Sequence, residues 1–166
     1  MKPTIYLIER ISSGSLSIMG KPASGEQIDV EFKNIADQGI NTIVSLLEIG
    51  ESAEVGLQDE ETLATKNGMA FHSFPIEDYG LPASKDQFKV FSKSLFSAAA
   101  GGENIVIHCR AGIGRSGLVA AGVLLHSKYE PLDAFNHISN KRGETVPETD
   151  EQKNWLLENY EYITNG

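Results

Sequence analysis

One short stretch of the sequence, HCRAGIGRS at residues 108–116, combines residue types that could carry out chemistry. It holds the chain's single cysteine, Cys109, and an arginine six positions later, Arg115, with Gly112 and Gly114 in the loop between them. Glycine adopts backbone angles that are closed to other residues, so this loop can turn its N–H groups inward and form a nest for an anion. A thiol and an anion-binding loop therefore coincide in one segment.

The residues on either side of the loop predict a strand before it and a helix after it. Residues 104–108 (NIVIH) are a short β-branched run, and residues 115–129 are apolar nearly all round, which is typical of a buried helix. A helix that begins near Arg115 points unpaired N–H groups and its positive dipole end at the loop. That arrangement favours phosphate as the ligand and the thiolate form of Cys109. Arg115 can add a planar, two-pronged contact to phosphate oxygens.

The run HCRAGIGRSG resembles the HCxxGxxR[ST] signature of the cysteine-dependent protein tyrosine phosphatase superfamily. The chain from Thr42 to Gln152 is similar to its small dual-specificity and kinase-associated group. The resemblance implies that Cys109 attacks phosphorus to form a cysteinyl phosphate and that Arg115 stabilises the transition state. It also implies that Ser116 steadies the thiolate as a leaving group. No metal and no cofactor are implied.

The resemblance also assigns supporting positions around the loop. The phosphate-binding residues it implies are Arg110, Ala111, Gly112, Ile113, Gly114 and Arg115. His108 is expected to support the loop from behind. For the side chain of Arg110, a solvated charge is an equally good interpretation, because this loop position varies within the family.

Cleavage of a phosphate ester needs a proton for the leaving oxygen, so we expect a carboxylic acid on a loop opposite the anion-binding loop. The candidate segment is FPIEDYGLP, residues 74–82, which follows a predicted strand and contains a glycine between two prolines. It is similar to the segment that supplies the general acid in small members of the superfamily. Asp78 matches that acid, about thirty residues before Cys109, and Glu77 is the alternative.

Two further polar residues are candidates for supporting roles. The segment VPETDEQ resembles the region where related phosphatases place a polar residue near the hydrolytic water, which points to Gln152; a surface position in the first turn of a helix is the competing interpretation. Glu48 follows a predicted strand, where related enzymes often carry a charged residue that pairs with the loop arginine. A solvated loop acid is the preferred interpretation of Glu48.

The remaining sequence alternates strands with helices. The predicted strands are 4–8, 16–19, 41–48, 69–74 and 104–108, with a turn at 12–17, and the predicted helices are 27–38, 51–67, 84–100, 115–129, one that opens at Pro131, and 148–163. This order predicts an α/β fold with a central, mostly parallel sheet of four to five strands and helices on both faces. The resemblance implies a phosphotyrosine protein phosphatase-like fold. We expect one domain over residues 1–166, with the active loop at the carboxyl end of strand 104–108.

Composition excludes several classes of partner. The 166 residues carry a formal net charge of −9, which argues against a nucleic acid or a membrane surface as a ligand. One cysteine cannot form an internal disulfide, and the apolar run at residues 5–8 is too short for a signal peptide, so we expect a cytoplasmic protein. We also expect a monomer that acts on phosphorylated proteins or peptides. Phosphate, sulfate or vanadate would occupy the active loop.

The predicted activity is hydrolysis of phosphotyrosine monoesters, with phosphoserine and phosphothreonine left open. A rhodanese-like sulfur transferase is one alternative, since it also places a cysteine in an anion-binding loop, but it needs no acid such as Asp78. A non-catalytic module that binds phosphorylated partners is the other alternative.

Overall fold

A computed structural model describes residues 2–165 and folds them around one five-stranded sheet. The strands are β1 (Tyr6–Ile11), β2 (Gly14–Met19), β3 (Thr42–Ser45), β4 (Ala70–Ser73) and β5 (Asn104–His108). They lie in the order β1-β2-β5-β3-β4, with β1 antiparallel to β2 and all other neighbours parallel. The predicted α/β fold with a central, mostly parallel sheet is confirmed.

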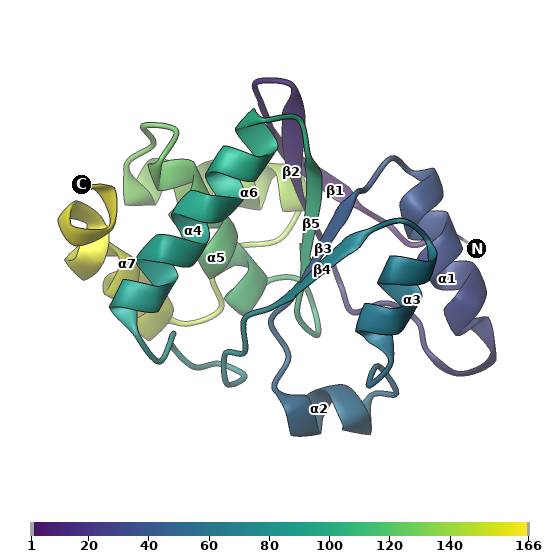
Figure 1. The fold of residues 1–166 in the computed structure, drawn as a ribbon. Coiled ribbons are helices and arrows are strands. Elements are labelled where there is room, and N and C mark those ends of the chain that lie inside the picture. The colour runs from purple at the N-terminus through teal and green to yellow at the C-terminus, as the bar shows by residue number, and fades with distance from the viewer. Residues whose placement is uncertain (1, 166) are drawn as a thin grey trace.

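Helices cover both faces of this sheet (Figure 1). One face carries α1 (Ile28–Asp37) and α3 (Glu60–Lys66), and the other carries α4 (Lys85–Ala100), α5 (Gly114–Leu125), α6 (Pro131–Arg142) and α7 (Asp150–Thr164). A 3-10 turn (Gly25–Gln27) precedes α1, and α2 (Ile49–Glu54) lies beyond the carboxyl end of β3. Successive strand residues point to opposite faces. In β5, Ile105 and Ile107 therefore join the core beneath α4–α7, while Val106 joins the core beneath α1 and α3.

Several predicted elements have other bounds in the structure: the predicted strand 4–8 is Tyr6–Ile11, and the predicted helix 115–129 is Gly114–Leu125. The predicted helix 51–67 is two helices, α2 and α3, because Gly56 adopts a left-handed φ of +76° between them. The predicted turn 12–17 is shorter, since β2 already begins at Gly14 and pairs with β1 in a hairpin. The predicted strand 41–48 has strand geometry only from Thr42 to Ser45. None of these differences moves the segment from β5 to α5.

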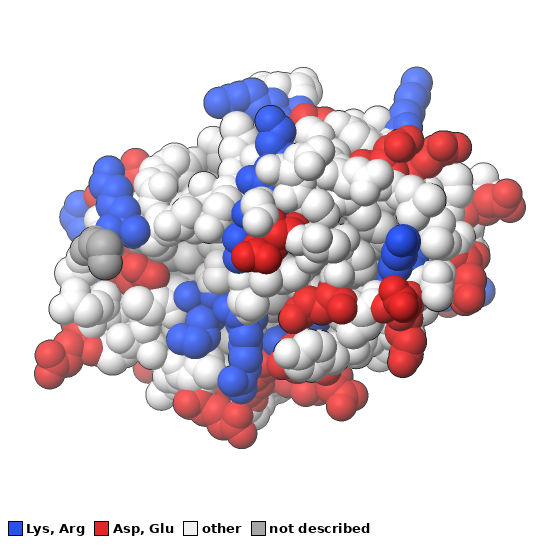
Figure 2. All heavy atoms as spheres, turned by 180° about the vertical axis from the view of Figure 1, so that it is seen from behind, with Lys and Arg blue, Asp and Glu red and all other residues white. Residues whose placement is uncertain are grey.

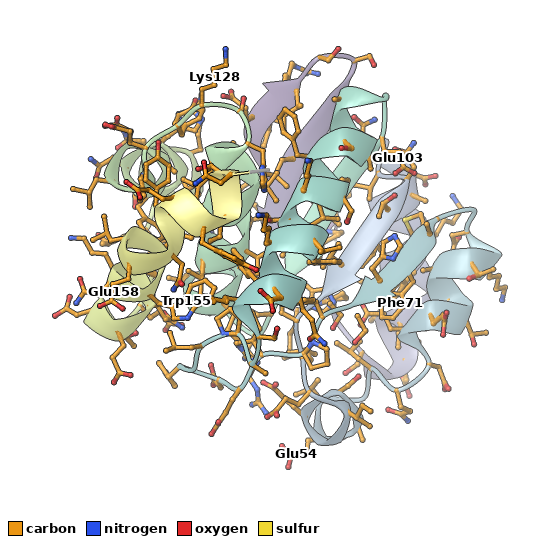
Figure 3. All side chains as sticks on the ribbon, turned by 60° about the vertical axis from the view of Figure 1, so that its left-hand side comes forward. Glu54, Phe71, Glu103, Lys128, Trp155 and Glu158 are labelled. Atoms are coloured by element: carbon orange, nitrogen blue, oxygen red, sulfur yellow. The ribbon has the colours of Figure 1, made fainter. Side chains whose placement is uncertain are left out.

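Close packing holds α5 in the centre of its layer. Every residue of this helix is buried. Two glycines allow neighbours to approach, because a Cβ at Gly122 would lie 2.5 Å from the Phe88 ring and a Cβ at Gly117 would lie 2.7 Å from Val146. Phe88 in turn meets Trp155 edge to face at 4.9 Å between ring centroids, where α4 and α7 come together (Figure 3).

Across residues 2–165, no helix combines the length and the apolar character that crossing a bilayer requires.

Candidate active site

Cys109 directly follows β5, at the carboxyl edge of the sheet and in front of α5. Its side chain is buried, with 2% exposure for the residue. Ser116 lies in the first turn of α5, and its Oγ donates a hydrogen bond to Cys109 Sγ at 3.0 Å. A hydroxyl that donates to sulfur stabilises negative charge on that atom. The structure thus brings together the predicted nucleophile and the serine predicted to steady it.

Three consecutive carbonyl groups of the loop are held from outside. The carbonyl oxygen of Arg110 accepts from Lys21 N at 2.9 Å, and those of Ala111 and Gly112 accept from Arg142 Nη2 at 2.8 Å and Nε at 2.9 Å. In a trans peptide the C=O and the following N–H point in opposite directions. The N–H groups of residues 111–113 therefore face away from Lys21 and Arg142, as a nest for an anion requires.

Gly112 is needed in this loop for two reasons. Its φ of +72° lies in the left-handed region that favours glycine. A Cβ at this position would also stand 2.6 Å from the carbonyl oxygen of Met19, at the end of β2. The loop consequently packs tightly against the end of β2, and this contact fixes the position of the loop relative to the sheet.

Arg142 is a functional candidate that the sequence reasoning missed. It is the last residue of α6, and its guanidinium lies 4.2 Å from the centroid of the Tyr6 ring while it binds the two loop carbonyls. An arginine just before Gly143, which caps the helix with a φ of +82°, is also what an ordinary helix end looks like. No local pattern distinguishes the two roles, so the contact could not be predicted from the sequence.

Arg115 lies at the start of α5 with 1% exposure and with carboxylates on two sides. Its Nη1 and Nη2 donate to the two oxygens of Glu51 at 2.8 and 2.9 Å, and Nη1 also donates to the carbonyl of Ile76 at 2.9 Å. Burial opposes the charge on this guanidinium, but its hydrogen bonds to Glu51 and the charges of Cys109, Glu51 and Asp78 together raise the pKa of Arg115. Among the described residues, Nε has no hydrogen-bond partner.

Glu51, and not Glu48, pairs with the arginines of the loop. Arg110 Nε donates to Glu51 Oε2 at 2.7 Å, and Arg110 Nη2 lies 3.3 Å from Glu54. Hydrogen bonds from Arg115 outweigh burial and, with those from Arg110, lower the pKa of Glu51 from 4.5 to about 2. Glu48 is exposed at the N-cap of α2, where its N–H donates to Glu51 Oε1 at 3.2 Å. Because α2 begins at Ile49, Glu51 lies in its first turn, and from there its side chain contacts Arg110 and Arg115.

Asp78 reaches the same guanidinium from the segment after β4. Its Oδ1 lies 3.2 Å from Arg115 Nη2 and accepts a hydrogen bond from Tyr79 N at 3.1 Å, and its side chain is 43% exposed. Glu77 is exposed; its carbonyl accepts from Gly80 N at 2.7 Å, which closes a tight turn. Of the two acid candidates, the structure places Asp78 beside Arg115.

Gln152 is buried at the start of α7 and ties that helix to the acid segment. Its Oε1 accepts from the N–H groups of Glu148 and Thr149, at 3.2 and 3.3 Å, and its Nε2 donates to the carbonyl of Gly80 at 3.1 Å. The residue is thus in the first turn of a helix, as one interpretation held, but it is not on the surface. It holds the segment that carries Asp78.

His108 lies behind the loop, fully buried at the end of β5. It contacts the carbonyl of Cys109 and the carboxylate of Glu60, which comes from α3. Glu60 was also missed from the sequence, although a signal existed. A glutamate at this position shares one helical face with Leu57, Leu63 and Ala64, and a charge on an apolar face points to a buried partner.

The mouth of the site is acidic. A hollow of about 450 Å³ lies there, lined by Glu48, Gly50, Glu51, Glu54, Glu77, Asp78 and Arg110. Figure 2 shows acidic side chains gathered along the lower edge of the molecule, the edge at which α2 lies in Figure 1, and Figure 3 shows Glu54 at its lowest point. A ligand that enters here meets carboxylates before it meets the loop.

Known proteins resemble this chain in sequence and in fold. The chain is 27% identical over 133 residues to cyclin-dependent kinase inhibitor 3 of Rattus norvegicus, which covers 79% of this chain and 62% of that protein. The chain thus spans about three fifths of the length of that curated relative. Kinase associated phosphatase (KAP) has the same fold, with a TM-score of 0.89 at 23% identity over 100% of this chain and 98% of that one. Tk-PTP in its active form gives a TM-score of 0.79 at 26% identity, over 97% and 99% of the two chains.

The family match covers most of the residues that build the site, though not Arg142 or Gln152. Residues 17–128, which run from within β2 to just beyond α5, match the family described as "Polymorphic toxin system, DSP-PTPase phosphatase". That range includes Cys109, Arg115 and Asp78, and it agrees with the resemblance that the loop sequence carries. The chain is therefore a member of this DSP-PTPase phosphatase family.

Proposed function

We propose that this protein hydrolyses phosphate monoesters of proteins or peptides, phosphotyrosine among them, through a cysteinyl phosphate on Cys109. The observation that carries the proposal is the 3.2 Å contact between Asp78 Oδ1 and Arg115 Nη2, because it places a carboxyl group beside the arginine that ends the Cys109 loop. Family membership supports it. So does KAP, whose solved structure carries a serine in place of its catalytic site cysteine.

In the first step, Cys109 Sγ attacks phosphorus in line with the leaving oxygen. The S–P bond forms as the P–O bond of the ester breaks, and the Asp78 carboxyl group gives its proton to the departing oxygen. The free Nε–H of Arg115 and the inward N–H groups of residues 111–113 hold the equatorial oxygens of the transferring group. A bound phosphate dianion takes the place of Asp78 at Arg115 and leaves the carboxyl group free for the leaving oxygen.

In the second step, water replaces the sulfur on phosphorus. The Asp78 carboxylate takes a proton from the attacking water, the O–P bond forms, and the S–P bond breaks to return the thiolate and release phosphate. The hydroxyl of Ser116, 3.0 Å from Cys109 Sγ, stabilises that thiolate as it leaves. Gln152 acts on this step indirectly, because it holds the turn at Gly80 next to Asp78.

The test measures phosphate release from p-nitrophenyl phosphate and from phenyl phosphate, whose leaving group is poorer. Cys109→Ser should abolish turnover of both. Asp78→Asn should slow phenyl phosphate about 100-fold or more, and more than p-nitrophenyl phosphate, because only the poor leaving group depends strongly on protonation.

Glu77→Gln, the exposed neighbour without contact to Arg115, is the matched control and should retain the parent rate on both substrates. If Asp78→Asn matches Glu77→Gln on both, Asp78 is not the acid. If the parent protein releases no phosphate but transfers sulfur from thiosulfate to cyanide, the sulfur transferase alternative replaces the phosphatase.

A further inference from the structure

We propose that Glu60 is a positioning residue for the nucleophile, acting through His108 on the peptide group of Cys109. The proposal rests on the proposed function only in that Cys109 is the nucleophile. Glu60 Oε2 lies 2.5 Å from His108 Nε2, and the two side chains are 2% and 0% exposed. His108 Nδ1 lies 3.2 Å from the carbonyl oxygen of Cys109. A chain of contacts therefore runs from α3 to the first peptide of the active loop.

The geometry fixes where the proton of the imidazole must be. A carbonyl oxygen only accepts hydrogen bonds, so His108 Nδ1 must carry a proton to bond the carbonyl of Cys109. At Nε2 the remaining proton lies between nitrogen and the Glu60 carboxyl group, as an imidazolium–carboxylate pair or as a neutral imidazole that accepts from a carboxylic acid. Both arrangements keep Nδ1 protonated, whereas a neutral imidazole without Glu60 is free to move its proton to Nε2.

The hydrogen bond from His108 Nδ1 orients the first peptide group of the loop. The carbonyl that it holds belongs to the peptide between Cys109 and Arg110, whose N–H points the opposite way. This is the peptide just before the three whose carbonyls are held by Lys21 and Arg142. This peptide is therefore held at its carbonyl like the three that follow, and its N–H points away from His108.

Glu60 makes the folded protein less stable than an apolar residue at the same position would. Leu63 and Ala64 are buried on the same helix, and Leu57, in the connection before it, is buried too. Within the described residues, Glu60 Oε1 has no hydrogen-bond partner, and a buried polar atom without one destabilises the fold. Packing alone would favour a leucine or methionine here, so packing does not explain the carboxyl group, whereas its bond to His108 does.

Other charged groups near Cys109 reach it from different elements. Arg115 acts on it from α5 and is itself bonded to Glu51 of α2 and Asp78 of the acid segment. In residues 2–165, Glu60 is the charged side chain bonded to His108. A change at Glu60 thus alters the contact with His108 and leaves the contacts of Arg115 with Glu51 and Asp78 in place.

The experiment compares Glu60→Met, Glu60→Gln and the exposed control Glu61→Met. Methionine matches the length of glutamate but cannot bond Nε2, whereas the glutamine amide can donate to Nε2 and so keep the proton on Nδ1. Three quantities are measured: the rate of Cys109 alkylation by iodoacetamide from pH 5 to 9, kcat on p-nitrophenyl phosphate, and the ¹⁵N shifts of His108. The histidine signals are assigned by replacing His72, His126 and His137 one at a time.

We expect Glu60→Met to lower kcat and alkylation about 10- to 100-fold, the usual effect of losing a hydrogen bond to a charged group. Glu60→Gln should stay within about threefold of the parent, since its amide donates to Nε2 and so keeps the proton on Nδ1. Glu61→Met should match the parent. In the parent protein, the ¹⁵N spectra should show His108 protonated at Nδ1. This measurement needs no substitution at Glu60. A purely structural role of Glu60 would not require that protonation.

Two results would overturn the proposal. One is a parent spectrum in which the only proton of His108 is on Nε2. The other is a folded Glu60→Met protein whose alkylation profile and kcat equal those of the parent. Alkylation needs no phosphatase activity, so a parent that releases no phosphate but loses Cys109 reactivity in Glu60→Met would contradict the proposed function and leave the role of Glu60 standing.

Discussion

Replacing Glu51 by glutamine should make the stability of this protein less dependent on pH in acid. The hydrogen bonds from Arg115, opposed by burial and aided by Arg110, lower the pKa of Glu51 from 4.5 to about 2 in the folded protein. A carboxyl group whose pKa is lowered by folding stabilises the fold while it is ionised. That contribution is complete above pH 4.5 and is lost as the pH falls through about 2.

The size of the contribution follows from the two pKa values. The difference between 4.5 and about 2 corresponds to about 3 kcal/mol of unfolding free energy, at about 1.4 kcal/mol per pH unit. The Glu51 side chain is only 9% exposed, so solvent screens the pair weakly. Glu51→Gln also leaves the buried Arg115 without its two-oxygen partner, and breaking such a pair costs roughly 3 to 5 kcal/mol near neutral pH.

Urea unfolding between pH 2 and 7 measures this effect as the difference in unfolding free energy between the parent and Glu51→Gln. The difference should be several kcal/mol near pH 6 and should shrink by about 3 kcal/mol toward pH 2. Glu54→Gln is the matched control, because Glu54 is 74% exposed and lies 3.3 Å from Arg110, outside the pair with Arg115. A difference that is constant across this pH range would refute the assignment of the ion pair.

Three further predictions concern the loop, the core and the acidic mouth. Arg142→Ala should lower kcat/KM on p-nitrophenyl phosphate roughly tenfold, because two loop carbonyls lose their donors, whereas Lys141→Ala should not. Gly122→Ala should destabilise the fold by about 1 to 3 kcal/mol in thermal unfolding, since its Cβ would meet the Phe88 ring, while Gly50→Ala, with no atom within 4 Å, should be tolerated. Phosphopeptides with lysine or arginine beside the phosphorylated residue should be cleaved with a higher kcat/KM than acidic ones, and added salt should reduce the difference. Equal rates for basic and acidic peptides at low salt would contradict the role given to the carboxylates at the mouth.

The site was predictable where its members are close in sequence. Cys109, Arg115 and Ser116 lie within one strand–loop–helix unit, so a short pattern fixes their spacing and their positions relative to the helix start. Asp78 was named because its segment, FPIEDYGLP, resembles the one that supplies the acid in small members of the superfamily, about thirty residues before the cysteine. In the structure Ser116 contacts Cys109 and Asp78 contacts Arg115, while the catalytic roles of these residues stay predictions.

Residues that reach the site from other elements were not predictable in the same way. Glu51 and Arg142 contact the loop only because of the order in which the strands pair and the faces on which α2 and α6 lie, and neither is encoded locally. Glu48 was named from the resemblance, with a solvated acid as the preferred interpretation; the structure has it exposed, and Glu51 makes the contact with Arg115. The break at Gly56 shows a similar limit, since a glycine inside a polar helical pattern can end the helix or be tolerated within it.

The complete burial of α5 has a consequence for how this protein could work. A helix enclosed on all sides cannot shift without disturbing the core, so the groups at its first turn are already oriented before any ligand arrives. The entropic cost of ordering them is met once, during folding, and need not be met again at each turnover. If the site adjusts to different ligands, we expect the segment that carries Asp78 to move, because the Asp78 side chain is exposed.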